Sequence, residues 1–221
     1  MSAWFRVWQL VDSAFPSGGF THSGGLESAV QHGDVRTVDD LQRIALVAVR
    51  QAGWGGLPFV AAAHRAPGDL PELDARIDVF LNQPVSNRAS RAQGAALLNA
   101  ALRIFPDAPL RSIADVVRRD EVAGHHAPMC GAVLAALDVD LDVTMRIFLY
   151  QAARTVVSAG VRLGIAGAFD GQRVQAGAAG EIERTLDRCR GLTVDDVAHT
   201  APILDVYQST HDRLYSRLFQ S

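Results

Sequence analysis

Two short stretches hold the histidines whose spacing could support metal or acid–base chemistry. The first is Gly-His-His-Ala-Pro at residues 124–128. In a helix, His126 and Cys130 would share one face, because side chains four residues apart are neighbours. Pro128 is typical of a helix start, however, and neither H-E-x-x-H nor a paired C-x-x-C accompanies the stretch. The pattern favours a capping or packing histidine pair beside a buried cysteine, and leaves open a transient metal contact through His125 and Cys130.

The second stretch is the dipeptide His211-Asp212, which helical metal phosphohydrolases also use. That chemistry needs further histidine and aspartate ligands, including an aspartate downstream. Nine residues follow Asp212 and none of them is acidic. We therefore expect a surface or interface pair on the last helix. A helical metal-dependent hydrolase using His125, His126, His211 and Asp212 remains the alternative function.

Lysine is absent from the sequence, because all 21 basic residues are arginine. A Schiff-base mechanism needs a side-chain amine, and a P-loop or a protein kinase needs its lysine, so these three classes are excluded. The serine-glycine segments at 17–19 and 23–25 do not form the G-x-S-x-G nucleophile elbow. We expect no catalytic residue, no resident metal and no cofactor belonging to this chain.

Charge and cysteine content limit the partners and the compartment. The net charge is −3 and the arginines are scattered, which argues against nucleic-acid binding. Cys130 and Cys189 are too few for a disulfide framework, and the first eight residues do not read as a signal peptide. These features indicate a cytoplasmic protein.

The segment 143–169 is nearly all apolar or small, and it raises the question of a membrane span. Arg146, Arg154 and Arg162 interrupt it at intervals of eight. Each arginine at bilayer depth would cost roughly 2.5–3.5 kcal/mol. A buried central helix of a soluble bundle explains the segment better, so no membrane contact is expected.

Helix formers dominate the composition, with 34 alanines and few β-branched runs. Glycine and proline breaks separate the apolar-periodic segments, as at 16–19, 53–58 and 106–109, and Thr37 has the sequence of an N-cap. We predict one all-α domain over residues 1–221, a bundle of about ten helices. Its long buried central helix is expected at 141–166, and its last two helices at 170–190 and 202–218.

The C-terminal segment is aromatic and basic to its last residue. Three-four spacing over 207–218 predicts an amphipathic helix; the residues are Tyr207, His211, Leu214, Tyr215 and Leu218. Tyrosine and arginine are enriched at interface hot spots. Two interpretations stay open: the segment packs into the core of its own chain, or it docks on a partner.

Four ordered segments together resemble the urease accessory protein F family. They are Ala-Phe-Pro-Ser-Gly-Gly-Phe-Thr-His-Ser-Gly-Gly-Leu-Glu at 14–27, Gly-His-His-Ala-Pro at 124–128, Asp-Gly-Gln at 170–172 and Ser-Arg-Leu-Phe-Gln-Ser at 216–221. The match covers essentially the whole chain in order. Two positions depart from the family pattern: Ala168 replaces a glutamine, and Asn87 stands where a glutamate often precedes the arginine.

The resemblance implies an all-α homodimer that works in urease maturation and is not itself an enzyme. Members join the accessory protein D or H, and together they recruit the GTPase accessory protein G and dock on urease apoprotein. GTP is then bound by a partner, and nickel passes through the complex as cargo.

The resemblance also implies partner-binding residues. In the family, the aromatic residue of the GGF-type loop and the arginine of the C-terminal signature lie near the D/H contact, which maps to Phe20 and Arg217. The full expected set is Phe20, His22, Glu27, His211, Tyr215, Arg217, Leu218 and Phe219.

Overall fold

The computed structural model describes residues 3–106 and 109–221, and within them it contains helices and no strand. The α-helices are α1 (Ala3–Val11), α2 (Leu26–Gln31), α3 (Val38–Gly55), α4 (Leu57–Arg65), α5 (Leu70–Phe80), α6 (Pro84–Ile104), α7 (Leu110–Arg119), α8 (His126–Ala136), α9 (Leu141–Arg162), α10 (Ala168–Gly177), α11 (Ala179–Cys189) and α12 (Pro202–Thr210). Three short 3-10 turns accompany them: η1 (Gly19–Thr21), η2 (Pro67–Asp69) and η3 (His211–Arg213). The all-α prediction is confirmed. Of the break expected at 106–109, residues 107 and 108 lie outside the described residues.

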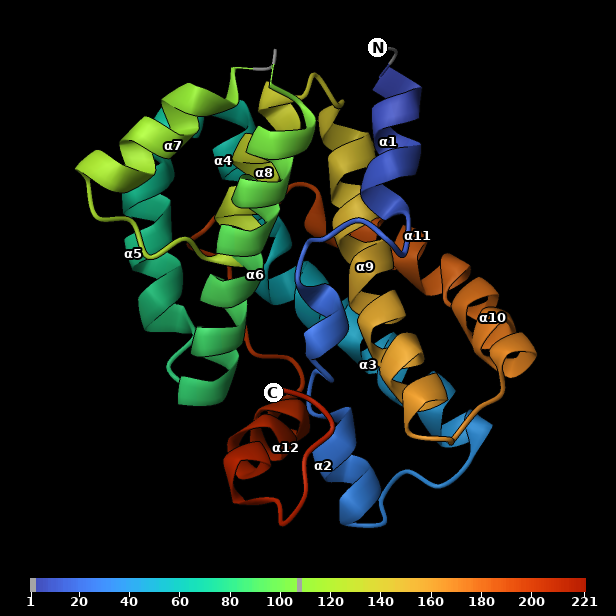
Figure 1. Ribbon diagram of the computed structural model, residues 1–221. Coiled ribbons are helices and arrows are strands. Elements are labelled where there is room, and N and C mark those ends of the chain that lie inside the picture. The colour runs from blue at the N-terminus through green and yellow to red at the C-terminus, as the bar shows by residue number, and fades with distance from the viewer. Residues whose placement is uncertain (1–2, 107–108) are drawn as a thin grey trace.

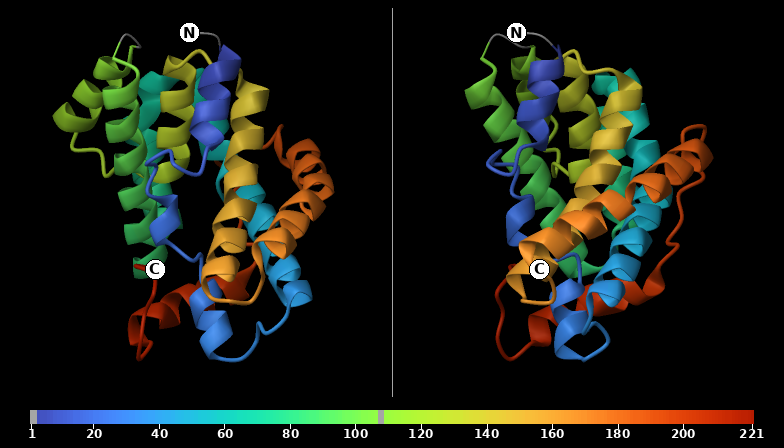
Figure 2. Two further views of the ribbon diagram at one scale, coloured as in Figure 1. Left: turned by 45° about the vertical axis from the view of Figure 1, so that its right-hand side comes forward. Right: turned by 90° about the vertical axis from the view of Figure 1, so that its right-hand side faces the viewer.

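Helix α9 runs through the middle of the molecule and packs on α3, α4, α8, α10 and α11 (Figure 1). Figure 2 shows α4–α8 on one side of it and α10–α11 on the other. The expected long central helix is therefore confirmed, and it ends at Arg162. Gly164 follows in the left-handed region, where glycine is favoured, and the N–H of Ile165 donates to the carbonyl of Gly160.

The three arginines of α9 reach polar partners at its surface. Arg146 pairs with Glu183, Arg154 donates to the carbonyl of Val11, and Arg162 donates to the carbonyl of Phe20. No single helix in the described ranges is long and apolar enough to cross a membrane. The bent pair α3 and α4 together passes that test by length and composition.

Two glycines allow helices to approach until backbone meets backbone. A Cβ on Gly131 would collide with the carbonyl oxygen of Val60, which brings α8 directly onto α4. A Cβ on Gly94 would collide with the carbonyl oxygen of Gly124, which brings the turn before α8 onto α6. The second contact fixes His125 and His126 against α6.

Two expected helix boundaries are wrong. The helix predicted over 170–190 is divided at Ala178 into α10 and α11. The helix predicted to reach Leu218 ends at Thr210, followed by η3 and an irregular segment. This C-terminal segment lies beside α2 and α12 at one end of the molecule (Figure 1). The backbone N–H groups of Leu218, Phe219 and Gln220 have partners elsewhere in the chain, described below, in place of helical carbonyls.

Candidate functional site

Glu27 on α2 is a buried carboxylate, 2% exposed, that binds the C-terminal segment. One oxygen, Oε1, accepts the N–H of Leu218 at 2.5 Å; the other, Oε2, accepts the N–H of Phe219 at 3.2 Å. Oε2 also lies 3.0 Å from Nε2 of His211, which is itself fully buried. A buried carboxylate is costly unless it is fully hydrogen-bonded, and this one has three donors. Glu27 therefore joins the segment 211–219 to the body of the protein.

The last residues continue the attachment along the loop after η1. The N–H of Gln220 donates to the carbonyl of Thr21 at 2.8 Å, and the N–H of Ser23 donates to the carbonyl of Ser221 at 2.6 Å. Nδ1 of His22 lies 2.5 Å from Oγ of Ser221. Burial lowers the pKa of His22, and the nearby His211 lowers it further, so the His22 ring is neutral at pH 7.

Arg162 at the end of α9 lies between two aromatic rings. Its guanidinium carbon is 4.0 Å from the centre of the Phe20 ring and 4.2 Å from that of Phe219. The Phe219 ring is 6% exposed, whereas Phe20 is 65% exposed. A guanidinium over an aromatic face is attracted by the ring quadrupole. Arg162 thus connects the loop at 18–22 with the C-terminal segment.

Asp212 connects η3 to α6 and to Arg217. Nη2 of Arg88 donates to both carboxylate oxygens of Asp212, at 3.1 and 2.8 Å, while Nη1 of Arg217 lies 3.5 Å from Oδ1. The hydrogen bond from Arg88 is the main cause that lowers the pKa of Asp212. Arg217 makes the longer contact, and about half of its side chain is exposed.

The eight expected partner-binding residues thus fall into two groups. His22, Glu27, His211 and Phe219 are buried and hold the C-terminal segment in place. Phe20, Tyr215, Arg217 and Leu218 expose much of their side chains, and we call these four residues the exposed set. The C-terminal segment thus packs on its own chain through His211 and Phe219, and it presents Tyr215, Arg217 and Leu218 outward. Partner binding by the exposed set remains a prediction.

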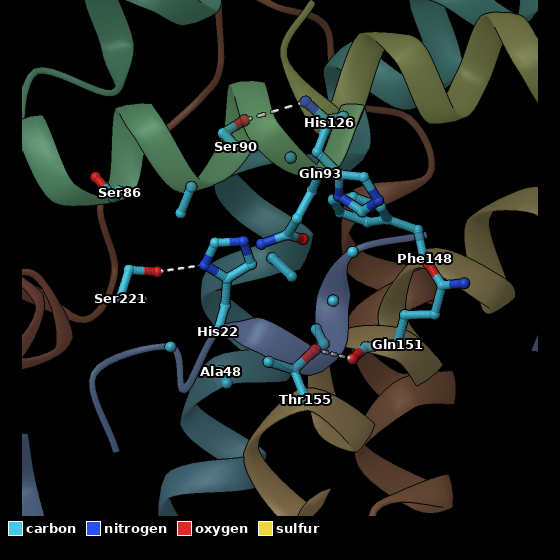
Figure 3. Close-up of a pocket in the computed structure, with 18 of the residues that line it drawn as sticks. His22, Ala48, Ser86, Ser90, Gln93, His126, Phe148, Gln151, Thr155 and Ser221 are labelled. Carbon is cyan, nitrogen blue, oxygen red and sulfur yellow. Dashed lines mark hydrogen bonds between the residues drawn. The ribbon is translucent and has the colours of Figure 1, made fainter. Parts of the chain in front are cut away.

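A cavity of about 740 Å³ lies beside this attachment, between the loop at 13–24 and helices α3, α6 and α9 (Figure 3). Polar and aromatic side chains share its lining, among them His22, Gln93, His126, Phe148, Gln151 and Thr155. The ring of His126 stacks on Phe148 with centroids 5.6 Å apart. Burial lowers the pKa of His126 to about 4, with His22 as the second cause. The imidazoles of His22 and His126 are therefore neutral at pH 7.

The two residues considered for metal contact, His125 and Cys130, are a hydrogen-bonded imidazole and a buried thiol. His125 uses both ring nitrogens: Nε2 lies 2.9 Å from Oδ1 of Asp78 and Nδ1 lies 3.1 Å from Oγ of Ser90. Cys130 is buried, and burial raises the pKa of its thiol to about 12, which suppresses the metal-binding thiolate. Across residues 3–106 and 109–221, no three His, Cys, Asp or Glu side chains are placed to hold a metal ion.

The same geometry bears on the alternative hydrolase. His211 is bonded to Glu27, Asp212 to Arg88, and His125 to Asp78. These contacts lie within the protein's own framework, and the four residues of that hypothesis form no metal cluster in the described chain. The hydrolase interpretation gains no support.

Several residues of these networks were not singled out from the sequence. Asp74 on α5 accepts the N–H groups of Gly124 and His125, and Asp78 accepts from His125 and from Nδ2 of Asn87 at 2.9 Å. Asn87, a departure from the family pattern, thus donates to a carboxylate, which a glutamate there could not do when ionised. No short motif signals these contacts, because they join three helices.

Fold and site together define an all-α protein in which the buried carboxylate of Glu27 attaches the C-terminal segment to the body of the chain. The family model UreF matches residues 35–179. The chain is 36% identical to urease accessory protein F of Arabidopsis thaliana over 219 residues, which is 97% of this chain and 91% of that protein. It is 33% identical to urease accessory protein F of Oryza sativa subsp. indica over 224 residues, covering 99% and 85% of the two chains. It is also 30% identical to urease accessory protein UreF of Agrobacterium fabrum over 222 residues, covering 100% and 97%.

The chain belongs to the UreF family of urease accessory proteins. The resemblance noted in the sequence is confirmed, and a role in urease maturation follows from it.

Proposed function

We propose that this chain is the member of a urease maturation complex that joins the accessory protein D/H to the GTPase accessory protein G. In that complex it couples the nucleotide state of the GTPase to nickel delivery into urease apoprotein. The observation that carries the proposal is the exposed set, of which Tyr215, Arg217 and Leu218 lie on the C-terminal segment held by Glu27. Aromatic and arginine side chains on a fixed backbone bind partners with little ordering cost.

Arg217 is the residue of this surface that we expect to matter most. Its guanidinium is permanently charged and can donate two parallel hydrogen bonds to a carboxylate. Among the described residues, the contact it would give up is the long one with Asp212. Arg217→Ala is expected to abolish co-purification with the D/H protein while helicity stays unchanged. Arg213→Ala, an exposed arginine in η3, is the matched control and should co-purify normally. Unchanged co-purification of Arg217→Ala would contradict the proposal.

Nickel and GTP belong to the complex in this proposal, with nickel as cargo and GTP on the partner. The absence of lysine supports the assignment, because a P-loop needs that residue. The purified chain is expected to hydrolyse no GTP above background. Turnover that stays with the chain through successive purification steps would overturn the assignment.

We further propose a cytoplasmic homodimer. Both cysteines, Cys130 and Cys189, are unpaired, as suits a reducing compartment. Trp4 and Trp8 on α1 are each more than half exposed and supply apolar surface for a second copy. Sedimentation of the purified chain should give a mass near twice 23.7 kDa, whereas a monomer at micromolar concentration would contradict the dimer.

A further inference from the structure

Three side chains from three elements form a linked array beside the cavity. Asp78 lies on α5, Ser90 on α6 and His125 in the turn before α8. His125 stands between the others, with Nε2 at 2.9 Å from the Asp78 carboxylate and Nδ1 at 3.1 Å from the Ser90 hydroxyl. Serine hydrolases use the same order of aspartate, histidine and serine. There Nδ1 binds the aspartate and Nε2 faces the serine, whereas here the two ring nitrogens exchange these roles.

The hydrogen-bond donors in this array can be assigned. Hydrogen bonds from Asn87 and then from His125 lower the pKa of Asp78, so its carboxylate is ionised at pH 7. It therefore accepts a hydrogen bond from Nε2 of His125, and the other ring nitrogen, Nδ1, faces the Ser90 hydroxyl. In the tautomer with its proton on Nε2, Nδ1 accepts the hydroxyl hydrogen of Ser90. The ring is poised as a general base toward Ser90.

The array is rigid and correctly supported. His125 is fully buried, and its backbone N–H is held by Asp74 at 2.7 Å. The close approach at Gly94 leaves the turn before α8 no space to move away from α6. A catalytic base needs this kind of fixed orientation.

Ser90 also faces a site that can stabilise negative charge. It lines the cavity, and its Oγ accepts the N–H of His126 at 3.1 Å, where α8 begins (Figure 3). The first N–H groups of a helix lack helical acceptors and carry its positive dipole end. Ala127, the next residue of α8, and Gln93, one turn beyond Ser90 on α6, also line the cavity. The start of α8 thus places positive dipole charge next to Ser90, whose Oγ takes the His126 N–H.

The lining selects the kind of ligand. His22 and His126 in the lining are neutral. The carboxylate and the guanidinium of the lining have partners: Arg154 donates to the carbonyl of Val11, and Asp205 lies 3.1 Å from Nδ1 of His199, which also lines the cavity. Phe15, Phe80 and Phe148 supply apolar wall. An uncharged ligand with an apolar body suits a cavity of this volume.

We propose that Ser90 is a catalytic nucleophile that takes the acyl group of an uncharged carboxylic ester bound in the cavity. The bond from Oγ to the acyl carbon forms and the ester C–O bond breaks, while the serine proton passes through Nδ1 of His125 to the leaving alcohol. Water then attacks the acyl-serine, gives one proton through His125 back to Ser90, and releases the acid. Ester and water yield acid and alcohol with no other reactant. The maturation role proposed above does not use Ser90, so the two proposals can fail separately.

The test uses the purified full-length chain and a fluorophosphonate probe, which labels an activated serine with loss of fluoride. Intact-mass and peptide analysis should show one label per chain, on Ser90. Ser90→Ala should remove it. The matched control Ser86→Ala should keep it, because Ser86 also lines the cavity from α6 but donates to the carbonyl of Gln83. The ester probe p-nitrophenyl butyrate should show a burst that Ser90→Ala abolishes.

Variants of His125 and Asp78 show whether Ser90 is labelled because these residues activate it or only because the probe can reach it. His125→Gln should slow labelling by about 10²-fold or more. Since His125 is buried, Asp78→Asn on a half-exposed side chain serves as the second variant, with circular dichroism to verify the fold. It should slow labelling by about tenfold or more, because the ring tautomer is no longer fixed. An unlabelled Ser90 in the folded chain, or labelling that is equally fast in the folded Asp78→Asn variant, would overturn the proposal.

Discussion

Replacing Glu27 by glutamine should detach the C-terminal segment while the rest of the fold stays intact. The substitution keeps the side-chain volume but turns one accepting oxygen into an amide NH₂. In the native chain those oxygens accept from Leu218, Phe219 and His211, all at 3.2 Å or less. Whichever way the amide turns, at least one N–H donor then meets another donor.

The magnitude follows from what the structure shows at this carboxylate. A hydrogen bond to a charged group contributes about 1.5–3 kcal/mol, and an unsatisfied buried donor costs about 1–3 kcal/mol. Losing one of the three bonds and weakening the others predicts about 3 kcal/mol. Because segments can open locally, this cost is expected to appear in the segment 214–221 before it appears in global unfolding.

Native-state hydrogen exchange read by mass spectrometry measures this opening. Peptides covering 214–221 should exchange roughly 10²-fold faster in Glu27→Gln, since about 1.4 kcal/mol corresponds to a factor of ten. Peptides from α9 should be unchanged. Glu183→Gln is the matched control, because Glu183 makes a half-exposed pair with Arg146 that contributes little. Equal protection of 214–221 in wild type and Glu27→Gln would refute the role given to this carboxylate.

Two further predictions concern the body of the protein. The lowered pKa of His126, about 4 when folded against about 6.5 when unfolded, means that the unfolded chain binds the extra proton between these values. The free energy of unfolding should therefore reach its full value above pH 6.5 and fall by at most about 3 kcal/mol as the pH drops to 4. The urea midpoint of His126→Gln should fall less over the same range. Equal falls of the urea midpoint in the wild type and in His126→Gln would be evidence against a neutral buried ring. Gly131→Ala should destabilise the fold by about 1–3 kcal/mol, because the added Cβ forces α8 away from α4. Gly191→Ala, with open space around its Cβ, should not destabilise it. Equal denaturation midpoints for the two variants would show that the helices can separate freely.

The sequence predicted helices correctly where caps, breaks and apolar periodicity within one segment determine them. Thr37 accepts the N–H of Asp40, and the Asp40 side chain accepts the Thr37 N–H, so the cap expected there is confirmed. The long apolar segment with its arginines is helix α9. Its composition and breaks lie within one stretch of chain, which is why sequence periodicity was sufficient.

Contacts between distant residues explain what the sequence could not predict. The three-four spacing after Thr210 suggested a continued helix, but Glu27, 191 residues from Leu218, binds the backbone N–H groups there. Likewise nothing local links Ser90 to His125, since their contact depends on the close backbone approach at Gly94. The partition of the C-terminal segment into buried and exposed side chains arises from the same long-range contacts.

Native mass spectrometry of the chain co-expressed with the D/H protein and the GTPase tests most directly whether this UreF-family chain joins the two. We expect one assembly that contains two copies of the 23.7 kDa chain together with both partners. Recovery of the chain free of the D/H protein and the GTPase, with all three folded and present, would contradict it.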